Sequence, residues 1–498
     1  MKLFFKKYRE LFLFILIGFG VMLFATKSSP LIGFNDWGDA NIYFTIGKGM
    51  FNGVIPYKEL FDQKGPLLYL IYGIGSLFSK TSFLGIYIIE SISFGFILYF
   101  VKKITSLYLK APFTIIATII FPIFFLNSEF FRQGGSPEEF IVLFLLISIY
   151  LFLKYFKENE IQHEPKVALY QGLIFACVFL IKFNYILALI PYLGTVTIIL
   201  ISNKEYKNLI LNIKNFIFGV LLIFIPFLIY FLVTNSFADF YHAYIHFNMV
   251  YGDAKINKAN IMRFCQMLGN IKESAVALTI LFTYFAFIIS KKFIKAPAKI
   301  ALAISLYITL FTLYFGGRAY GYYQLIITIF IPFSLVWIFS FFDKLKISSF
   351  ASTCLYTIFV PFSIYCVIYT NSNYYKQDEN NDVYGKFAEI INREKDPTLM
   401  LYDNLRVAFF TKANIMPNTK YFFYPNIDSK DYKILGETQD DYIRNKEIMF
   451  VITAERIDNI EIFSREGYEV INENCDLIES QYAAIENRKY IFYLYKVK

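Results

Sequence analysis

Two aspartates near the start of the sequence have the setting that acid–base chemistry requires. Asp36 and Asp39 lie in FNDWGDANIYF, within the connecting segment of residues 30–83 that follows the first long apolar run. An aspartate beside an apolar surface and within hydrogen-bond reach of a hydroxyl or amine can act as a general base. Either one could instead cap the helix predicted through IYFTIGKGM. We expect residues 30–83 to form the active-site loop of a membrane enzyme.

A lysine in the same segment has the chemistry to bind phosphate. Lys64 lies two residues before Pro66, which begins the short apolar stretch PLLYLIYGIGSLF. An ammonium group at a membrane surface can neutralise a phosphate as it departs, although many lysines at this depth only extend their charge to water. The turn Gly53-x-x-Pro56-Tyr57 lies between the aspartates and Lys64, and we expect its tyrosine to contact the substrate.

Further carboxylates lie at or inside apolar runs. Glu138 and Glu139 follow Pro137 at the start of one run. One of them could supply a second carboxylate to the site, or both could interact favourably with the positive end of a helix dipole. Glu90 lies within the apolar run YIIESISFGF, where a carboxylate usually faces the interior of a helix bundle or a partner.

Two isolated cations lie at the tips of predicted helix pairs. Lys182 occurs in LIKFNY and Arg318 in GGRAYGYYQ. Both positions run against the usual distribution of basic residues around a membrane, so each cation is expected to have an anionic partner, such as a phosphate or pyrophosphate on a lipid carrier. Tyr322 and its neighbours Tyr320 and Tyr323 could pack against a sugar or lipid chain, or could belong to an aromatic belt at the membrane surface.

A membrane protein must position these side chains. The 498-residue sequence is 57% hydrophobic and 20% aromatic, and its 17% of charged residues is lower than in ordinary soluble domains. Apolar runs recur through the first 370 residues, as expected for repeated membrane spans. We predict a mainly α-helical, multi-pass fold with eleven spans at about residues 10–29, 84–101, 112–127, 139–155, 167–181, 185–201, 212–233, 275–290, 300–315, 324–341 and 351–370.

The basic residues indicate the orientation of the chain. Lysine clusters occur in alternate connections between the predicted spans, and such clusters mark the cytoplasmic side. The N-terminus is therefore expected to be cytoplasmic, and residues 30–83 and everything after 370 to be extracytoplasmic. This alternation requires residues 66–78 to lie at the surface without crossing, which their shortness favours. The clustering also argues against nucleic acid binding, despite a net charge of +9.

The composition changes after residue 370. Residues 371–498 are rich in Asn, Asp, Glu and Lys, and short β-like runs alternate with helical patterns. We predict a small extracytoplasmic α/β domain here, following a membrane domain at residues 1–370. Strands are predicted at residues 398–403, 420–425, 448–454, 468–473 and 490–497, and helices at residues 387–394 and 441–447.

The order of these motifs resembles the GT-C glycosyltransferases of family 39, which include protein O-mannosyltransferases and lipid A aminoarabinose transferases. Three motifs in the first loop and three later features carry the resemblance: Asp39-x-x-x-Tyr43, Gly53-x-x-Pro56-Tyr57, Lys64-x-Pro66-Leu67, the Pro-Glu-Glu start of a span, Lys182 and the Arg-x-Tyr loop. The resemblance covers most of the membrane part, and the predicted eleven spans are similar to that fold.

Two differences from the family pattern are present. Many relatives have two adjacent acids in the first loop, whereas this chain has Gly38-Asp39 with Asp36 three residues earlier. The choice of base is therefore open between Asp36 and Asp39. Relatives with a histidine–tyrosine pair after the arginine also differ, because Tyr322-Tyr323 stands here.

The resemblance implies transfer of a sugar from a polyprenyl-phosphate carrier to a glycan, lipid or protein acceptor of the cell envelope, on the outer face and with inversion at the anomeric carbon. It implies Asp39 as the base, Lys64 as a contact of the donor phosphate, and Lys182 and Arg318 as further phosphate contacts. We expect no cofactor, and nothing in the sequence indicates a divalent metal. The alternative is a transporter or flippase of lipid-linked sugars, which usually shows internal symmetry that we do not find.

Overall fold

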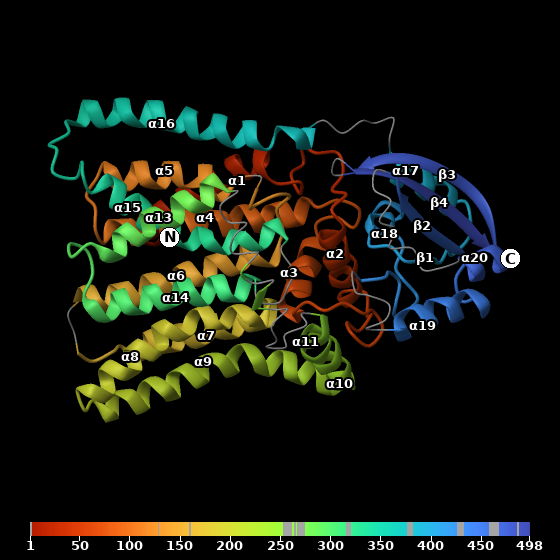
Figure 1. Ribbon diagram of the computed structural model, residues 1–498, viewed down its shortest axis with the longest axis horizontal. Helices are drawn as coiled ribbons and strands as arrows, with labels where there is room; N and C mark the ends of the chain where they lie inside the picture. The colour runs from red at the N-terminus through yellow and green to blue at the C-terminus, as the bar shows by residue number, and fades with distance from the viewer. Residues whose placement is uncertain are drawn as a thin grey trace. The chain divides into compact units, whose positions relative to one another are not determined.

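The computed structural model describes residues 2–127, 129–158, 161–251, 261–262, 265, 274–314, 320–375, 382–425, 433–457, 468–485 and 488–498 (Figure 1). The chain forms two compact units. Unit 1 comprises Met1–Ser29, Tyr87–Ile229 and Gly252–Asn373, and unit 2 comprises Pro30–Ile86, Tyr230–Tyr251 and Tyr374–Lys498. The terminal segment therefore shares a unit with the whole of the first loop and with Tyr230–Tyr251. The division into domains at residues 1–370 and 371–498 stays a prediction.

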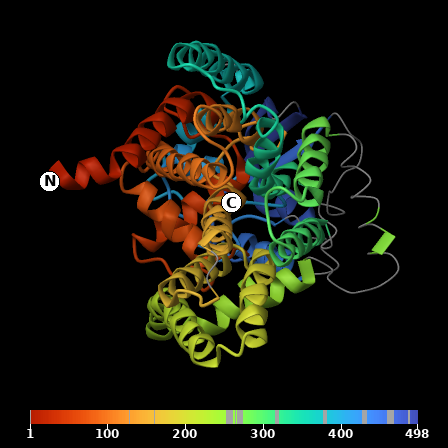
Figure 2. The same cartoon turned by 90° about the vertical axis from the view of Figure 1, so that its left-hand side faces the viewer.

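Unit 1 is made of apolar helices that run side by side in Figure 1 and are seen nearly end-on in Figure 2. They are α1 (Lys2–Ala25), α4 (Leu84–Ser106), α5 (Phe113–Phe125), α6 (Pro137–Glu158), α7 (Pro165–Ile181), α8 (Ile190–Ser202), α9 (Tyr206–Val233), α13 (Ala275–Ile289), α14 (Ala296–Tyr314), α15 (Ile331–Phe339) and α16 (Ser349–Thr370), with the 3-10 helices η1 (Phe183–Leu189) and η4 (Gly321–Phe330). Within the described residues, each of the eleven predicted spans overlaps one or more of these helices.

Within the described residues, eight helical stretches are long and apolar enough to cross a membrane. One of them, Pro165–Ser202, has 38 residues. At 1.5 Å per residue a continuous helix of this length would measure roughly 57 Å, about twice the hydrocarbon thickness of a bilayer. Lys182 interrupts it with extended backbone, φ −158° and ψ 101°. The stretch therefore consists of two spans, as predicted, with Lys182 at the break between them.

Two other predicted spans are short helices. The helix α5 has 13 residues and α13 has 15, which correspond to roughly 20 and 23 Å along the axis and fall short of a 30 Å hydrocarbon core. Both pack against α15. Phe113 stacks on Phe339 at 6.0 Å between ring centroids, and the hydroxyl of Ser334 donates to the carbonyl of Ile280 at 3.2 Å. These two helices are internal supports of the bundle as well as candidate spans.

Unit 2 contains a four-stranded sheet and several short helices. The strands β1 (Leu399–Leu401), β2 (Phe450–Arg456), β3 (Cys475–Ile485) and β4 (Arg488–Val497) lie in the order β1-β2-β4-β3. The β1–β2 pair is parallel and the other two pairs are antiparallel. The helical elements are α2 (Gly38–Met50), α3 (Pro66–Ser76), α10 (Phe237–Phe240), the π-helix η2 (Tyr241–His246), α11 (Phe247–Tyr251), α17 (Val383–Ile391), α18 (Ala408–Ala413), α19 (Lys433–Arg444) and α20 (Glu469–Asn474). A short 3-10 helix, η5 (Ser372–Tyr375), lies where the last segment of unit 2 begins.

The mixed α/β character of the terminal segment is confirmed, but its strands differ in part from the prediction. The predicted strands at 398–403, 448–454 and 490–497 contain β1, β2 and β4. Residues 420–425 are irregular, although the N–H of Leu401 donates to the carbonyl of Phe422 at 2.9 Å. Residues 468–473 mostly form α20, where Val470 and Ile471 are both buried. One turn of helix buries neighbouring residues together, whereas successive strand residues point to opposite faces.

Strand β3 was not predicted. It is the outermost strand of the sheet beside β4, and most of its side chains are exposed. Its register with β4 shifts at Leu477/Glu479. A strand exposed on both faces and interrupted by a shift does not alternate apolar with polar residues, which is the signal that sequence reading uses. The missing alternation explains why the prediction failed here.

Helices α2 and α3 of the first loop pack closely because two glycines face each other. A Cβ added at Gly47 would lie 2.5 Å from the carbonyl oxygen of Tyr69, and one added at Gly73 would lie 2.6 Å from the carbonyl oxygen of Gly47. Helix α3 has 11 residues, so at roughly 17 Å it is too short to cross a bilayer. Its packing against α2 fits the prediction that residues 66–78 do not span the membrane.

Candidate active site

Asp39 lies in the first turn of α2, and Asp36 lies three residues before it; both are half-buried. The N-cap residue is Trp37, which has extended backbone and makes no side-chain cap bond. The N-cap position of this helix is therefore occupied by Trp37 and by neither aspartate. Asp39 lies near the positive end of the helix dipole, which is carried by the first turn.

The aspartate segment is fixed within unit 2 by one asparagine. The side-chain amide of Asn41 donates to the carbonyls of Asn35 and Trp37, both at 2.9 Å. Its Oδ1 accepts a hydrogen bond from the hydroxyl of Thr411 at 2.6 Å. The asparagine is fully buried, so these bonds form away from water. The start of α2 is held by a residue of the terminal segment.

Gly38 explains one departure from the family pattern. A Cβ at this position would lie 2.8 Å from the carbonyl oxygen of Leu405. Any larger side chain would force the two backbones apart. The position next to Asp39 is therefore closed to a second acid in this chain.

The backbone around Lys64 is held by two buried tyrosines. The hydroxyl of Tyr57 donates to the carbonyl of Lys64 at 2.7 Å. The hydroxyl of Tyr69 accepts from the N–H of Lys64 at 3.0 Å and donates to Oδ2 of Asp62 at 2.7 Å. Burial, together with the nearby Asp62, raises the pKa of Tyr69 well above 10, so its hydroxyl keeps the proton that it donates. The ammonium nitrogen of Lys64 lies 5.9 Å from the ring centroid of Tyr43.

Tyr57 supports the Lys64 segment from inside the protein. Its side chain is fully buried and its φ is +67°, a left-handed conformation that few bulky residues adopt. Its ring contacts the rings of Phe231 and Phe240, at 5.9 and 5.6 Å between centroids. The hydroxyl of Tyr57 is bonded to the carbonyl of Lys64, so this side chain fixes the backbone at the lysine. Direct contact of Tyr57 with the substrate stays a prediction.

In unit 1, Glu138 and Lys182 form a buried ion pair. The ammonium of Lys182 lies 2.6 Å from Oε1 of Glu138, and the hydroxyl of Tyr185 donates to the same oxygen at 3.1 Å. The Glu138 side chain is 0% exposed and that of Lys182 is 15% exposed. The ammonium also lies 3.6 Å from the ring centroid of Tyr323, a cation–π distance. The anionic partner expected for Lys182 is thus a carboxylate of the same unit.

Glu139 faces a different partner from its neighbour. Its Oε2 accepts a hydrogen bond from the N–H of Gly135 at 2.8 Å, and the carboxyl group lies beside Glu90. The carboxylate of Glu90 accepts from the hydroxyl of Thr26 at 3.0 and 3.1 Å. Glu90 therefore joins the end of α1 to the start of α6, which fits the expectation that it faces the bundle interior.

Tyr322 is buried at the start of η4, in an aromatic group with its neighbours. It stacks on Tyr320 with 5.8 Å between centroids and meets Tyr323 edge-on at 4.9 Å. Tyr323 in turn lies under Lys182. Arg318, the other predicted cation, lies outside the described residues. Among the residues that are described, no cluster of three His, Cys, Asp or Glu side chains has the arrangement of a metal site.

Sequence reasoning missed the residues that hold the others in place. Asp62, Tyr69 and Asn41 carry buried polar groups: Tyr69 donates to Asp62, and Asn41 donates to the carbonyl of Asn35. The signal was present for Tyr69, since a tyrosine hydroxyl inside an apolar helix needs a partner. Nothing in the spacing of Asn41 indicated its bond to Thr411, which is 370 positions away.

Part of the chain matches a known family model. Residues 63–231 match the family model described as dolichyl-phosphate-mannose-protein mannosyltransferase. This range contains Lys64 and both members of the Glu138–Lys182 pair. Over these residues the chain is similar to this glycosyltransferase family. It is a multi-pass membrane glycosyltransferase, as the sequence predicted. No curated protein matches the sequence.

The fold of this glycosyltransferase is similar to that of ArnT from Cupriavidus metallidurans. The crystal structure of ArnT bound to undecaprenyl phosphate matches with a TM-score of 0.61 and 9% identity, covering 98% of each chain. The structure of ArnT in the apo state matches with a TM-score of 0.58 and 10% identity, covering 97% of each chain. The similarity extends over both units and confirms the predicted fold class.

One buried lysine of the glycosyltransferase gives a pH-dependent prediction. Lys48 in α2 is 3% exposed, and its ammonium has no hydrogen-bond partner among the described residues. Burial, with a contribution from Lys80, lowers the pKa of Lys48 from 10.5 to about 8. At pH 7 the folded state must bury a charge that the unfolded state keeps in water, which costs about 3 kcal/mol.

Lys48→Met is therefore expected to raise the thermal unfolding temperature at pH 7. The unfolded chain binds the additional proton between pH 8 and 10.5, so stability rises with pH across this range and the advantage of methionine disappears near pH 10.5. Unfolding curves of both proteins in detergent at pH 7 and 10 test this. An equal gain at both pH values, or a loss at pH 7, would contradict the assignment.

Proposed function

We propose that this glycosyltransferase transfers a sugar from a polyprenyl-phosphate carrier to a cell-envelope acceptor on the outer face of the membrane. The family model over residues 63–231 carries the proposal, because its description names dolichyl-phosphate mannose, a sugar on a polyprenyl-type phosphate. The structure of ArnT bound to undecaprenyl phosphate supports the same class of lipid. The carrier phosphoester supplies the driving force, so the reaction needs no nucleotide.

The reaction proceeds by inversion in a single displacement. Asp39, or Asp36 in its place, accepts the proton of the acceptor hydroxyl. The hydroxyl oxygen attacks the anomeric carbon, the bond from that carbon to the phosphate oxygen breaks, and polyprenyl phosphate leaves with the bonding electrons. Negative charge develops on the phosphate, and fixed cations lower the barrier where that charge appears.

Three cations are proposed to hold the phosphate. Lys64 is suited to this task because its backbone is fixed on both sides by Tyr57 and Tyr69. Lys182 is held by Glu138, which keeps its charge in one position. Arg318 is the third. We further propose that Glu139 and Tyr322 shape the substrate-binding region from the start of α6 and of η4.

The proposed orientation follows the basic residues. The N-terminus is cytoplasmic, and the first loop and the terminal α/β segment face the outside. A cysteine introduced at an exposed position of unit 2, such as Glu473→Cys, would then react with a membrane-impermeant thiol reagent added to intact cells. Reaction only after the cells are broken would contradict this orientation.

Reconstitution tests the function itself. The purified protein in vesicles, supplied with radiolabelled polyprenyl-phosphate sugar and an envelope fraction, is expected to move label to the acceptor with inverted anomeric configuration. The alternative, a transporter or flippase of lipid-linked sugars, predicts movement of the labelled lipid between leaflets without a new glycosidic bond. Detection of translocation alone would replace the proposed function by that alternative.

A further inference from the structure

An exposed arginine lies in the connection between α5 and α6 of unit 1. The guanidinium of Arg132 makes no hydrogen bond and no ion pair with any residue that the structure describes. Of the two carboxylates that follow in the sequence, Glu138 pairs with Lys182. The other, Glu139, accepts the N–H of Gly135. A guanidinium carries five N–H donors in one plane, an arrangement that matches the oxygens of a phosphate.

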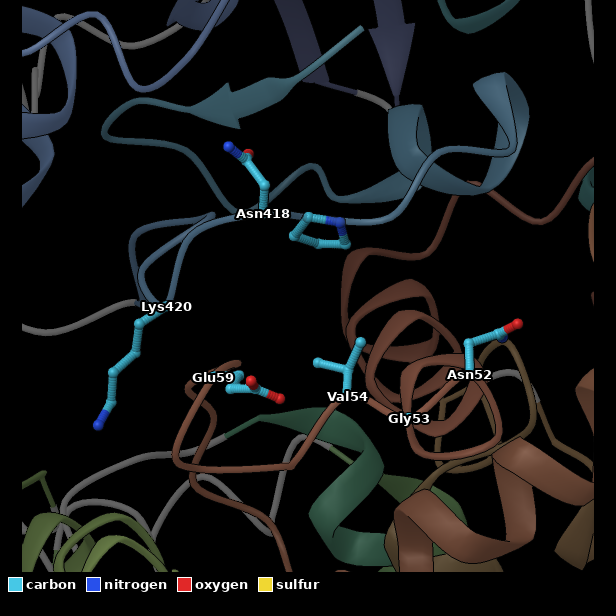
Figure 3. Close-up of a pocket in the computed structure, with 7 residues that line it drawn as sticks. Asn52, Gly53, Val54, Glu59, Asn418 and Lys420 are labelled. Carbon is cyan, nitrogen blue, oxygen red and sulfur yellow. The ribbon is translucent and has the colours of Figure 1, made fainter. Parts of the chain in front are cut away.

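Several partly exposed cations elsewhere in the chain have carboxylate partners. Lys420 lines a small hollow of unit 2 (Figure 3), and its ammonium lies 2.8 Å from Oδ1 of Asp239. The ammonium of Lys496 lies 2.6 Å from Oε1 of Glu394. Arg132 has no such partner among the described residues. Its positive charge and its donors are therefore available to an anion from outside the protein.

The backbone that carries Arg132 is fixed on both sides. The preceding residue, Phe131, is 1% exposed, and its N–H donates to the carbonyl of Asn127 at 2.9 Å. The carbonyl of the following residue, Gln133, accepts the N–H of Lys27 at 2.8 Å. Arg132 itself has a φ of +54°, a left-handed conformation that few residues other than glycine adopt. The side chain therefore starts from a well-defined position.

The guanidinium is packed against the backbone of another segment. A Cβ added at Gly321, the first residue of η4, would lie 2.8 Å from Nε and 2.9 Å from Nη2 of Arg132. The guanidinium therefore occupies the space that any other side chain at position 321 would need. This contact places it beside Tyr320 and Tyr322, whose rings stack on each other at 5.8 Å between centroids.

The start of η4 thereby has two cations near it. Arg132 contacts Gly321, and the ammonium of Lys182 lies 3.6 Å from the ring centroid of Tyr323, two residues further along. One carboxylate, Glu138, offsets the charge of Lys182. Together these three side chains carry a net charge of about +1 at neutral pH, because arginine and lysine are protonated and glutamate is ionised there. The region therefore attracts an anion.

We propose that Arg132 is a further ligand of the donor phosphate, held next to the Lys182 region by its contact with Gly321. This inference rests on the proposed function and adds a cation to the three named there. The donor is a phosphodiester with one negative charge, whereas the departing phosphate monoester carries up to about two. Arginine binds two oxygens of such a group at once. Its contact therefore strengthens as the bond to the sugar breaks.

The first test measures binding without transfer. Purified protein in detergent is incubated with radiolabelled undecaprenyl phosphate, the lipid bound to ArnT, and the retained label is counted. Arg132→Gln is expected to raise the Kd by about 10- to 100-fold, the value of a hydrogen-bonded contact to a charged group. Arg132→Lys should lose less, because it keeps the charge but not the two-point contact. In transfer assays, Arg132→Gln should lower the donor kcat/KM and leave the acceptor KM unchanged.

Gly321→Ala provides a second variant that keeps the arginine. Its Cβ would displace the guanidinium, which is the far end of a flexible side chain, so the thermal unfolding temperature should stay close to that of wild type. The Kd for undecaprenyl phosphate is expected to rise about tenfold in the wild-type background and to show no further rise in the Arg132→Gln background. Full additivity of the two changes would show that Gly321 does not act through Arg132 and would overturn the inference.

Arg393→Gln is the matched control, because Arg393 is also exposed and its guanidinium has no partner among the described residues. It should bind undecaprenyl phosphate as wild type does. Equal loss in this control, or wild-type binding by Arg132→Gln, would overturn the inference. Displacement of the labelled lipid by equimolar phosphatidylglycerol, through Arg132, would also overturn it, because the arginine would then bind ordinary membrane lipid.

The two proposals fail in different ways. A wild-type protein that retains undecaprenyl phosphate through Arg132 but transfers no sugar would contradict the proposed function and leave Arg132 as a phosphate ligand. A wild-type protein that transfers sugar, with Arg132→Gln equally active and equally able to bind the lipid, would leave the function standing and remove Arg132 from the site.

Discussion

Asp39→Asn is expected to lower sugar transfer by about 10²- to 10⁴-fold, the usual contribution of a general base. Asparagine keeps the size of the side chain but cannot accept the proton of the acceptor hydroxyl. The helix start stays intact, because Trp37 is the N-cap and Asn41 holds the turn through Asn35 and Trp37. The loss should therefore appear in kcat, with donor binding unchanged. Initial rates with labelled polyprenyl-phosphate sugar in membranes measure it.

Asp36→Asn is the companion variant, because Asp36 is also half-buried and lies three residues earlier. If Asp39 is the base, this variant keeps most of the activity. The reverse pattern, with Asp36→Asn inactive and Asp39→Asn active, would transfer the role to Asp36. Full transfer activity in both variants would rule out an aspartate base in this loop.

Lys182→Met is expected to destabilise the protein by about 3–5 kcal/mol, because it leaves the carboxylate of Glu138 buried with its main counter-charge removed. Glu138→Gln should cost less, since Lys182 retains some exposure and the ring of Tyr323 beneath its ammonium. The double variant should recover much of the stability lost in Lys182→Met. Thermal unfolding of the four proteins in detergent forms the double-mutant cycle.

The activities of these variants separate stability from chemistry. If Lys182 also contacts the donor phosphate, the double variant will be stable but will show a raised donor KM. A cycle in which the two single effects simply add would show that the pair is not coupled. A stable double variant with normal donor KM would confine Lys182 to its structural bond with Glu138.

Much of the membrane part was predictable because its signals are local. Each of the eleven apolar runs became a helix, and the break at Lys182 followed from a charge and an asparagine between two runs. The isolation of Lys182 indicated an anionic partner, for which we expected a lipid phosphate, whereas the structure pairs Lys182 with Glu138. The sequence did not identify Glu138 as this partner, because Glu138 and Lys182 are 44 positions apart. The packing of α6 against α7 brings the two side chains together.

The terminal segment was less predictable because its signals are weaker. Strand β3 is largely exposed and irregular in register, and α20 carries two neighbouring apolar residues that read equally as strand. The supporting bonds of the first loop, such as Thr411 to Asn41, join residues that no periodicity relates. Such contacts depend on the tertiary packing of unit 2, and the local pattern of a single sequence does not reveal that packing.

The close approach of Gly38 to the carbonyl of Leu405 has a consequence for chimeric proteins. The backbone next to Asp39 packs directly against the terminal segment. We therefore expect that the terminal segment cannot be replaced independently of the first loop. A chimera that takes residues 374–498 from a relative must bring residues 30–86 from the same parent, or the foreign loop will collide with or release the helix start. Exchange of either stretch alone is therefore expected to lower the stability of the protein by disturbing this contact.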